Sequence, residues 1–292
     1  MQRYATGLLV LMMNLPVAAV ESNSQDIPVT PAEQYKILRA EYDQASSSGI
    51  PLTDEERLKF VGRAYKHRYE LAQTFLELAE KNPNDPIALD ALMQAVWQVN
   101  GTPWPVELVG EDTARAKAFE LIQRDRIRSD KLGPLCQRIS YGFCKEYETL
   151  LRAALAKNPH KKVQAIACLS LGRFLNCRLL RLDLCKEQPE LAKQFAALFG
   201  EDYLAELLRQ NSETAIREIE GIFEQASAKY GDVTLPDGET VADESQRELF
   251  GIRHLSVGRE APDIEGEDQD GKRFKLSDYR GKVVLLDFWS YV

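Results

Sequence analysis

Five cysteines are the residues of this sequence whose chemistry could be catalytic: Cys136, Cys144, Cys168, Cys177 and Cys185. A thiolate attacks disulfides, and a reactive pair usually has Cys-x-x-Cys spacing. No two of the five stand at that spacing. The last three fall in a stretch that we expect to be helical, where eight or nine residues separate neighbours by roughly 12–13 Å, beyond disulfide reach. Only Cys136 and Cys144, which flank an expected chain reversal, could pair, and we expect all five to be buried apolar side chains.

Other catalytic chemistries have little support in the sequence. His67, His160 and His254 lie far apart, and none has a further ligand three or four residues away, so we expect no metal site. Glycine-rich nucleotide motifs and a Gly-x-Ser-x-Gly nucleophile turn are absent from the sequence. Acidic pairs such as Glu111-Asp112 stand at expected helix starts, where the helix dipole favours them. We therefore expect no catalytic, cofactor-binding or metal-binding residue in these 292 positions.

The charge balance argues against nucleic acid as a partner. Lys and Arg number 37 against 45 Asp and Glu, so the net charge is −8, and no segment concentrates the basic residues. A surface that follows phosphates needs clustered basic side chains.

Residues 1–19 resemble a cleavable signal peptide. Arg3 precedes an apolar stretch from Gly7 to Leu15, and Ala18-Ala19 provide small residues before a cleavage site. The apolar stretch is shorter than the roughly 20 residues that span a bilayer, and we expect no membrane-spanning segment later in the chain. We predict an exported protein, periplasmic or secreted, whose mature N-terminus at 20–31 is flexible.

Residues 32–255 read as an α-helical domain. Apolar residues recur at helical spacing, a Thr53–Glu56 capping box opens one helix, and an interruption near His67 is expected. Leu78-Ala79-Glu80-Lys81-Asn82-Pro83 is echoed by Leu155-Ala156-Lys157-Asn158-Pro159, each followed by an alanine-rich helix. Tetratricopeptide-like hairpins and an irregular helical bundle both fit this pattern.

The pattern changes at residues 256–292. Asp270-Gly271 is typical of a tight hairpin, and Val283 to Trp289 is a continuous apolar run that predicts a central strand covered on both faces. The fold class expected for the whole chain is therefore mainly α, followed by the incomplete start of an α/β domain.

The C-terminal motifs are Val257-Gly258, Ala261-Pro262-Asp263, Asp270-Gly271-Lys272, Leu276 to Lys282, and Val283 to Trp289. In this order they resemble the start of thioredoxin-like redoxins of the TlpA and alkyl hydroperoxide reductase/thiol-specific antioxidant group. The helical region is also similar to the extension found on some exported redoxins. In that family a Cys-x-x-Cys pair follows this strand, with its first cysteine four residues after the position of Trp289, one residue beyond Val292.

The resemblance implies an exported thiol–disulfide oxidoreductase or antioxidant redoxin, with a dithiol reductant and disulfide or peroxide substrates as partners. The chain as given would lack the catalytic pair and be inactive, and its apolar tail would either dock on the helices or stay disordered. The codon after Val292 could be UGA, read as selenocysteine or changed from a cysteine codon; a frameshift, an assembly break or a shortened clone are the alternatives. The competing function is a non-enzymatic helical interaction module with its own protein partner and a vestigial redoxin tail.

Overall fold

A computed structural model of the chain describes residues 29–46, 54–98, 113–268 and 270–287. The expected signal peptide and the side chains of the expected Thr53–Glu56 capping box lie outside the described residues.

Between Pro31 and His254 the described chain is almost entirely helical, as its apolar periodicity predicts. The helices are α1 (Pro31–Ser46), α2 (Asp54–Lys81), α3 (Ile87–Gln98), α5 (Thr113–Leu121), α6 (Gly133–Ile139), α7 (Lys145–Lys157), α8 (Lys161–Glu187), α9 (Pro189–Phe199), α10 (Glu201–Leu208), α11 (Ser212–Tyr230) and α12 (Val241–His254). A π-helical turn (Ile122–Arg126) and a 3₁₀ turn (Asp130–Leu132) join α5 to α6.

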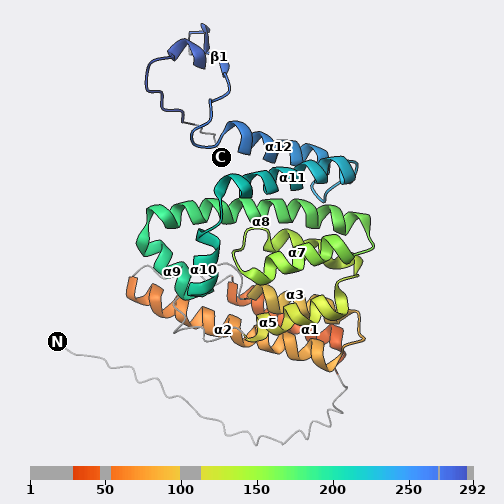
Figure 1. Ribbon diagram of the computed structural model, residues 1–292. Helices are drawn as coiled ribbons and strands as arrows, with labels where there is room; N and C mark the ends of the chain where they lie inside the picture. The colour runs from red at the N-terminus through yellow and green to blue at the C-terminus, as the bar shows by residue number, and fades with distance from the viewer. Residues whose placement is uncertain (1–28, 47–53, 99–112, 269, 288–292) are drawn as a thin grey trace, which may run out of the picture.

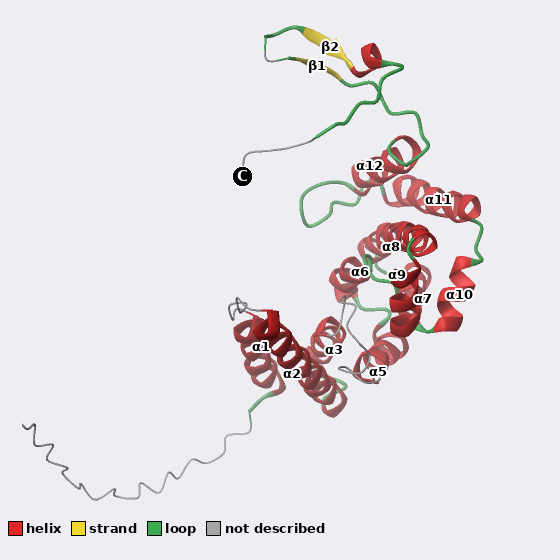
Figure 2. Cartoon of the chain, turned by 90° about the vertical axis from the view of Figure 1, so that its left-hand side faces the viewer, coloured by secondary structure: helices red, strands yellow, loops and turns green. Residues whose placement is uncertain are grey.

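The helices form a curved stack with α8 near its middle (Figures 1 and 2). On one side α1, α2, α3 and α5 pack in sequence order, and α5 contacts α7. On the other side α8 packs against α7 and α11, and α11 in turn packs against α12. Buried aromatic side chains such as Phe119, Tyr147, Phe174 and Phe223 belong to one core that continues through these layers. The expected mainly α fold class is confirmed.

Helix α8 corrects one expectation from the sequence. By length and composition it could cross a membrane, whereas we expected no such stretch after the N-terminus. Its place in the stack explains its apolarity, because 67% of its most apolar window is buried inside the structure. A central helix that is contacted on several sides needs apolar residues around most of its circumference.

Several helix ends follow from local sequence. The Ile87 N–H donates to Asp85 Oδ1 at 2.8 Å, so Asp85 caps the start of α3 as its sequence predicts. Thr240 and Asp243 form a capping box at the start of α12. Gly200 separates α9 from α10 with φ of 95°, which glycine adopts without strain. The interruption expected near His67 was wrong, since α2 is continuous there and that position carries no helix-breaking residue.

The two Asn-Pro motifs occupy similar places but make different contacts. Asn82 Nδ2 donates to the Leu78 carbonyl of its own helix at 2.9 Å. Asn158 is buried, and its Nδ2 donates to the carbonyls of Ile127 and Ser129, at 2.7 and 2.8 Å. The echo in the sequence therefore does not extend to these contacts, and a tetratricopeptide-like repeat stays a prediction.

After α12 the chain forms a small separate unit. Strands β1 (Glu265–Glu267) and β2 (Arg273–Lys275) pair antiparallel, and a 3₁₀ turn (Leu276–Tyr279) follows. Gly271 has φ of 76° in the connecting turn, which confirms the hairpin predicted from Asp270-Gly271. The strand expected from Val283 was wrong for the described residues 283–287, which form no strand. A strand needs a neighbour for its backbone hydrogen bonds, and the β1–β2 hairpin does not pair with this segment.

Candidate functional site

The motif residues of the C-terminal unit hold its hairpin and turn together. The Ser277 N–H donates to Asp263 Oδ1 and its hydroxyl donates to Asp263 Oδ2, both at 2.8 Å. The Leu276 N–H donates to the Ile264 carbonyl at 2.9 Å, next to this contact. These hydrogen bonds lower the pKa of the Asp263 carboxyl, because they favour its charged form. The Ala-Pro-Asp motif thus positions the segment that leads into the apolar run.

The apolar run itself is unpartnered. Val283 and Leu285 have relative exposures of 104% and 93%, and Val284 and Leu286 are also exposed. No residue of the unit from Val257 to residue 287 that the structure describes is buried. Of the two alternatives expected for this tail, docking on the helical domain is not what the structure shows for the described residues.

The five thiols lie in the helical domain, far along the chain from this unit. All are free; four are buried and Cys177 is half-buried. Burial raises the pKa of Cys136 to about 12 and that of Cys168 to about 11. It also raises the pKa of Cys177 and Cys185. A thiol that stays protonated at neutral pH is a poor nucleophile, so these four fit the buried apolar role.

Cys144 has the most polar surroundings of the five. It is the N-cap residue of α7, and its Sγ accepts a hydrogen bond from Arg115 Nη1 at 3.2 Å. A helix start and an arginine both favour a thiolate. Burial nevertheless dominates, and the pKa of Cys144 is raised although Arg115 opposes the shift. The thiol is inaccessible as well as protonated.

The three histidines are dispersed in structural contacts. His67 lies near Glu41, His254 stacks on Phe250 with ring centroids 5.0 Å apart, and the His160 N–H donates to Asn158 Oδ1. Within the described ranges, no three side chains of the His, Cys, Asp and Glu types gather in a way that could hold a metal ion.

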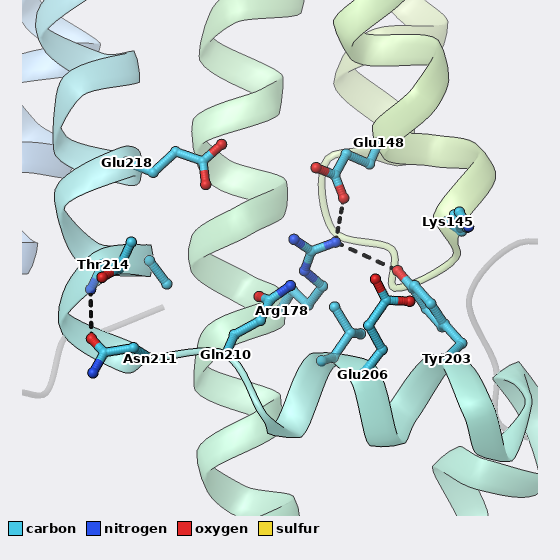
Figure 3. Close-up of a pocket in the computed structure, with 11 residues that line it drawn as sticks. Lys145, Glu148, Arg178, Tyr203, Glu206, Gln210, Asn211, Thr214 and Glu218 are labelled. Carbon is cyan, nitrogen blue, oxygen red and sulfur yellow. Dashed lines mark hydrogen bonds and ion pairs between the residues drawn. The ribbon is translucent and has the colours of Figure 1, made fainter.

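A polar pocket of about 400 Å³ opens beside α8 (Figure 3). We call it the α8 pocket; its lining residues come from α7, α8, α10 and α11 and the α10–α11 connection. They are Lys145, Glu148, Arg178, Tyr203, Glu206, Leu207, Gln210, Asn211, Thr214, Ala215 and Glu218.

Arg178 is the centre of the α8 pocket. Its side chain is 8% exposed, and its Nη1 forms an ion pair with Glu148 and lies 3.5 Å from Tyr203 Oη. Arg152 lies beside them and bridges Glu148 and Glu218. Burial favours protonation of Glu148, but the two arginines outweigh it and hold the pKa of that carboxyl below its ordinary value. Burial raises the pKa of Tyr203 to about 12, so the phenol stays neutral.

No local pattern in the sequence singles out the α8 pocket. One signal was available, because Arg178 interrupts a long apolar stretch of α8 between Cys177 and Leu179. A buried arginine requires a carboxylate partner. That partner, Glu148, is thirty positions away, and its identity becomes visible only when α7 packs on α8.

Comparison with known proteins locates a family resemblance in the C-terminal unit. Residues 257–291 match the AhpC/TSA family model. Thiol-disulfide oxidoreductase ResA of Bacillus subtilis is 48% identical over 40 residues, which are 14% of this chain and 22% of that protein. ResA of Geobacillus thermodenitrificans is 47% identical over 36 residues, 12% of this chain and 21% of that protein. No solved structure matches the chain.

The matches are confined to the unit that the Asp263–Ser277 contacts organise. The chain spans only about a fifth of the length of the curated relatives it matches, 21–22% of each. Residues 257–291 therefore resemble a segment of thioredoxin-like redoxins of the AhpC/TSA type.

Proposed function

Because residues 257–291 resemble a redoxin segment, we propose that this protein is an exported thiol–disulfide oxidoreductase whose redoxin domain follows a helical domain. The observation that carries the proposal is the match of this segment to the AhpC/TSA family, in the unit that Asp263 and Ser277 hold together. The named relatives that support it are thiol-disulfide oxidoreductases. The described residues do not include the reactive cysteine pair, and they do not identify the substrate.

The proposed chemistry is a two-electron exchange. In the family arrangement a cysteine pair follows the position of Trp289, at the start of a helix. The first cysteine, as thiolate, attacks one sulfur of a substrate disulfide and displaces the other as a thiolate. The second cysteine then breaks the mixed disulfide, so the substrate gains two electrons and the pair becomes a disulfide. A dithiol partner returns the two electrons.

The test uses the complete product of the gene, read in frame beyond codon 292. We expect a Cys-x-x-Cys pair, or selenocysteine in place of its first cysteine, four residues after Trp289. The purified product should catalyse reduction of insulin disulfides by dithiothreitol, and a Cys-to-Ser change in the pair should abolish the rate. A complete product without the pair, or with an intact pair and no disulfide or peroxide turnover, would contradict the proposal.

Export is the second part of the proposal. Its support is the order of Arg3, the apolar stretch from Gly7 to Leu15, and Ala18-Ala19. Expression in a bacterium with an outer membrane should place the protein in the periplasm with Val20 as its first residue. N-terminal sequencing checks this, and an Ala19→Arg variant should remain uncleaved. Recovery of the unchanged N-terminus from the cytoplasm would contradict export.

The helical domain supports a second candidate function, a module that binds another protein or peptide. The observation that favours it is the α8 pocket, none of whose lining residues belongs to the redoxin segment. Both functions could reside in one chain. If the complete gene product has no dithiol pair, the binding function alone remains.

A further inference from the structure

The feature of the helical domain with no assigned role is a buried arginine, Arg178, with hydrogen-bond donors left over. Its Nη1 contacts Glu148 and Tyr203, while Nε and Nη2 make no hydrogen bond to another described residue. The guanidinium lies in the α8 pocket with a free edge turned toward Gln210 of the α10–α11 connection and Thr214 of α11 (Figure 3). Because Glu148 and the ring of Phe174 hold the guanidinium in place, this edge is a preorganised carboxylate-binding group.

The other charges of the α8 pocket are balanced but separated. Glu148 and Glu218 are neutralised by Arg178 and Arg152. Lys145 and Glu206 have no ion pair within the described part of the chain, and Glu206 lies on α10 while Lys145 lies at the start of α7. The pocket has no large excess of positive or negative charge that would attract a ligand with a large net charge. A ligand that carries both an anionic and a cationic group matches the pocket.

We propose that the α8 pocket binds a short peptide through its free α-carboxylate and a cationic group. The carboxylate accepts hydrogen bonds from the free edge of Arg178, and the cationic group pairs with Glu206. The volume of about 400 Å³ lies in the range of small-ligand sites. The lining groups come from four helices, which suits an extended peptide better than a single amino acid.

The probe is the tripeptide Lys-Ala-Ala, titrated into the chain by isothermal titration calorimetry at low ionic strength. Two comparison peptides test the charges. Lys-Ala-Ala amide lacks the anionic carboxylate, and acetyl-Ala-Ala-Ala lacks the cationic groups. We expect each change to weaken binding at least tenfold. Free lysine carries the same charges on a single residue and should also bind at least tenfold more weakly.

Variants then connect binding to the named residues. Glu206→Gln should weaken Lys-Ala-Ala about tenfold and leave acetyl-Ala-Ala-Ala unchanged. Arg178→Lys keeps a cation beside Glu148 but removes the free guanidinium edge, and it should lose the preference for the acid over the amide. If thermal melting shows that Arg178→Lys is unfolded, Ala215→Trp fills the pocket from α11 and should abolish binding. Arg209→Gln, on an exposed residue outside the lining, is the matched control.

The proposal fails on any of four results: no binding of Lys-Ala-Ala at millimolar concentration, equal binding of its acid and amide, equal binding of free lysine, or an Arg209→Gln effect as large as that of Glu206→Gln. These results are independent of the redox activity, because no thiol takes part in the binding.

Discussion

The ion pair of Glu148 and Arg178 links stability to pH. Removing one partner of a buried pair leaves the other charge uncompensated, so Glu148→Gln should lower the free energy of unfolding at pH 7 by about 3 kcal/mol. The pKa of Glu148 is lowered in the folded state. The stabilisation is therefore complete above the carboxyl's ordinary pKa of 4.5 and is lost as the pH falls through the lower folded value.

Urea unfolding at several pH values checks this prediction. The difference in the free energy of unfolding between wild type and Glu148→Gln should shrink between about pH 5 and pH 3, because Glu148 becomes protonated there. Glu190→Gln is the matched control, because its pair with Lys193 is exposed and should contribute less than about 1 kcal/mol. A constant difference down to pH 3 would show that the charge of Glu148 is not the cause.

Residue chemistry also predicts the reactivity of the thiols. Cys136 and Cys168 are fully buried with raised pKa values, whereas Cys177 is half-buried. In the native chain at pH 8, a thiol reagent such as dithionitrobenzoate should modify Cys177 first and leave Cys136 and Cys168 unmodified for many minutes. All five should react at once in guanidinium. Peptide mapping by mass spectrometry identifies the sites, and rapid native labelling of Cys136 or Cys168 would refute their assignment as core residues.

At the scale of elements, the close approach of α8 and α11 depends on Gly172. A Cβ at this position would lie 2.7 Å from ring atoms of the buried Phe223. Gly172→Ala should therefore destabilise the chain by about 1–3 kcal/mol through overpacking, despite the better helix propensity of alanine. Gly221→Ala is the matched control: it lies in α11 with open space around its Cβ and should stabilise the chain by about 0.5–1 kcal/mol. Equal effects of the two substitutions in urea unfolding would refute the close contact.

At the scale of the whole molecule, the redoxin segment and the helical domain should be thermodynamically independent. No described residue after Leu255 is buried, so the segment contributes little to the helical core. A chain that ends at Ser256 should keep the thermal midpoint of the helical transition within about 2 °C, since lost stability scales with lost burial. Limited proteolysis should cleave residues 257–287 before any helix between α2 and α12. A drop of more than 5 °C, or first cleavage within α8, would contradict this independence.

The sequence by itself determined the helical class of residues 32–255, the cap at Asp85, and the resemblance of the C-terminal segment to redoxins. These features depend on periodicity, capping chemistry and motif spacing, which act over a few neighbouring residues. Two interpretations were wrong. The strand expected from Val283 has no neighbouring strand to pair with. Helix α8 is apolar enough to cross a membrane because it is a mostly buried central helix, which the sequence pattern did not indicate.

Only the tertiary structure decided which charges meet. In its own helix Glu148 meets Arg152 one turn further on, but its ion pair with the buried Arg178 forms only when α7 packs on α8. The α8 pocket arises in the same way, from four helices whose lining residues run from Lys145 to Glu218, 73 positions apart. Local pattern cannot reveal such a site, because Coulomb interactions and cavity shape depend on distances in space that the order of residues leaves open.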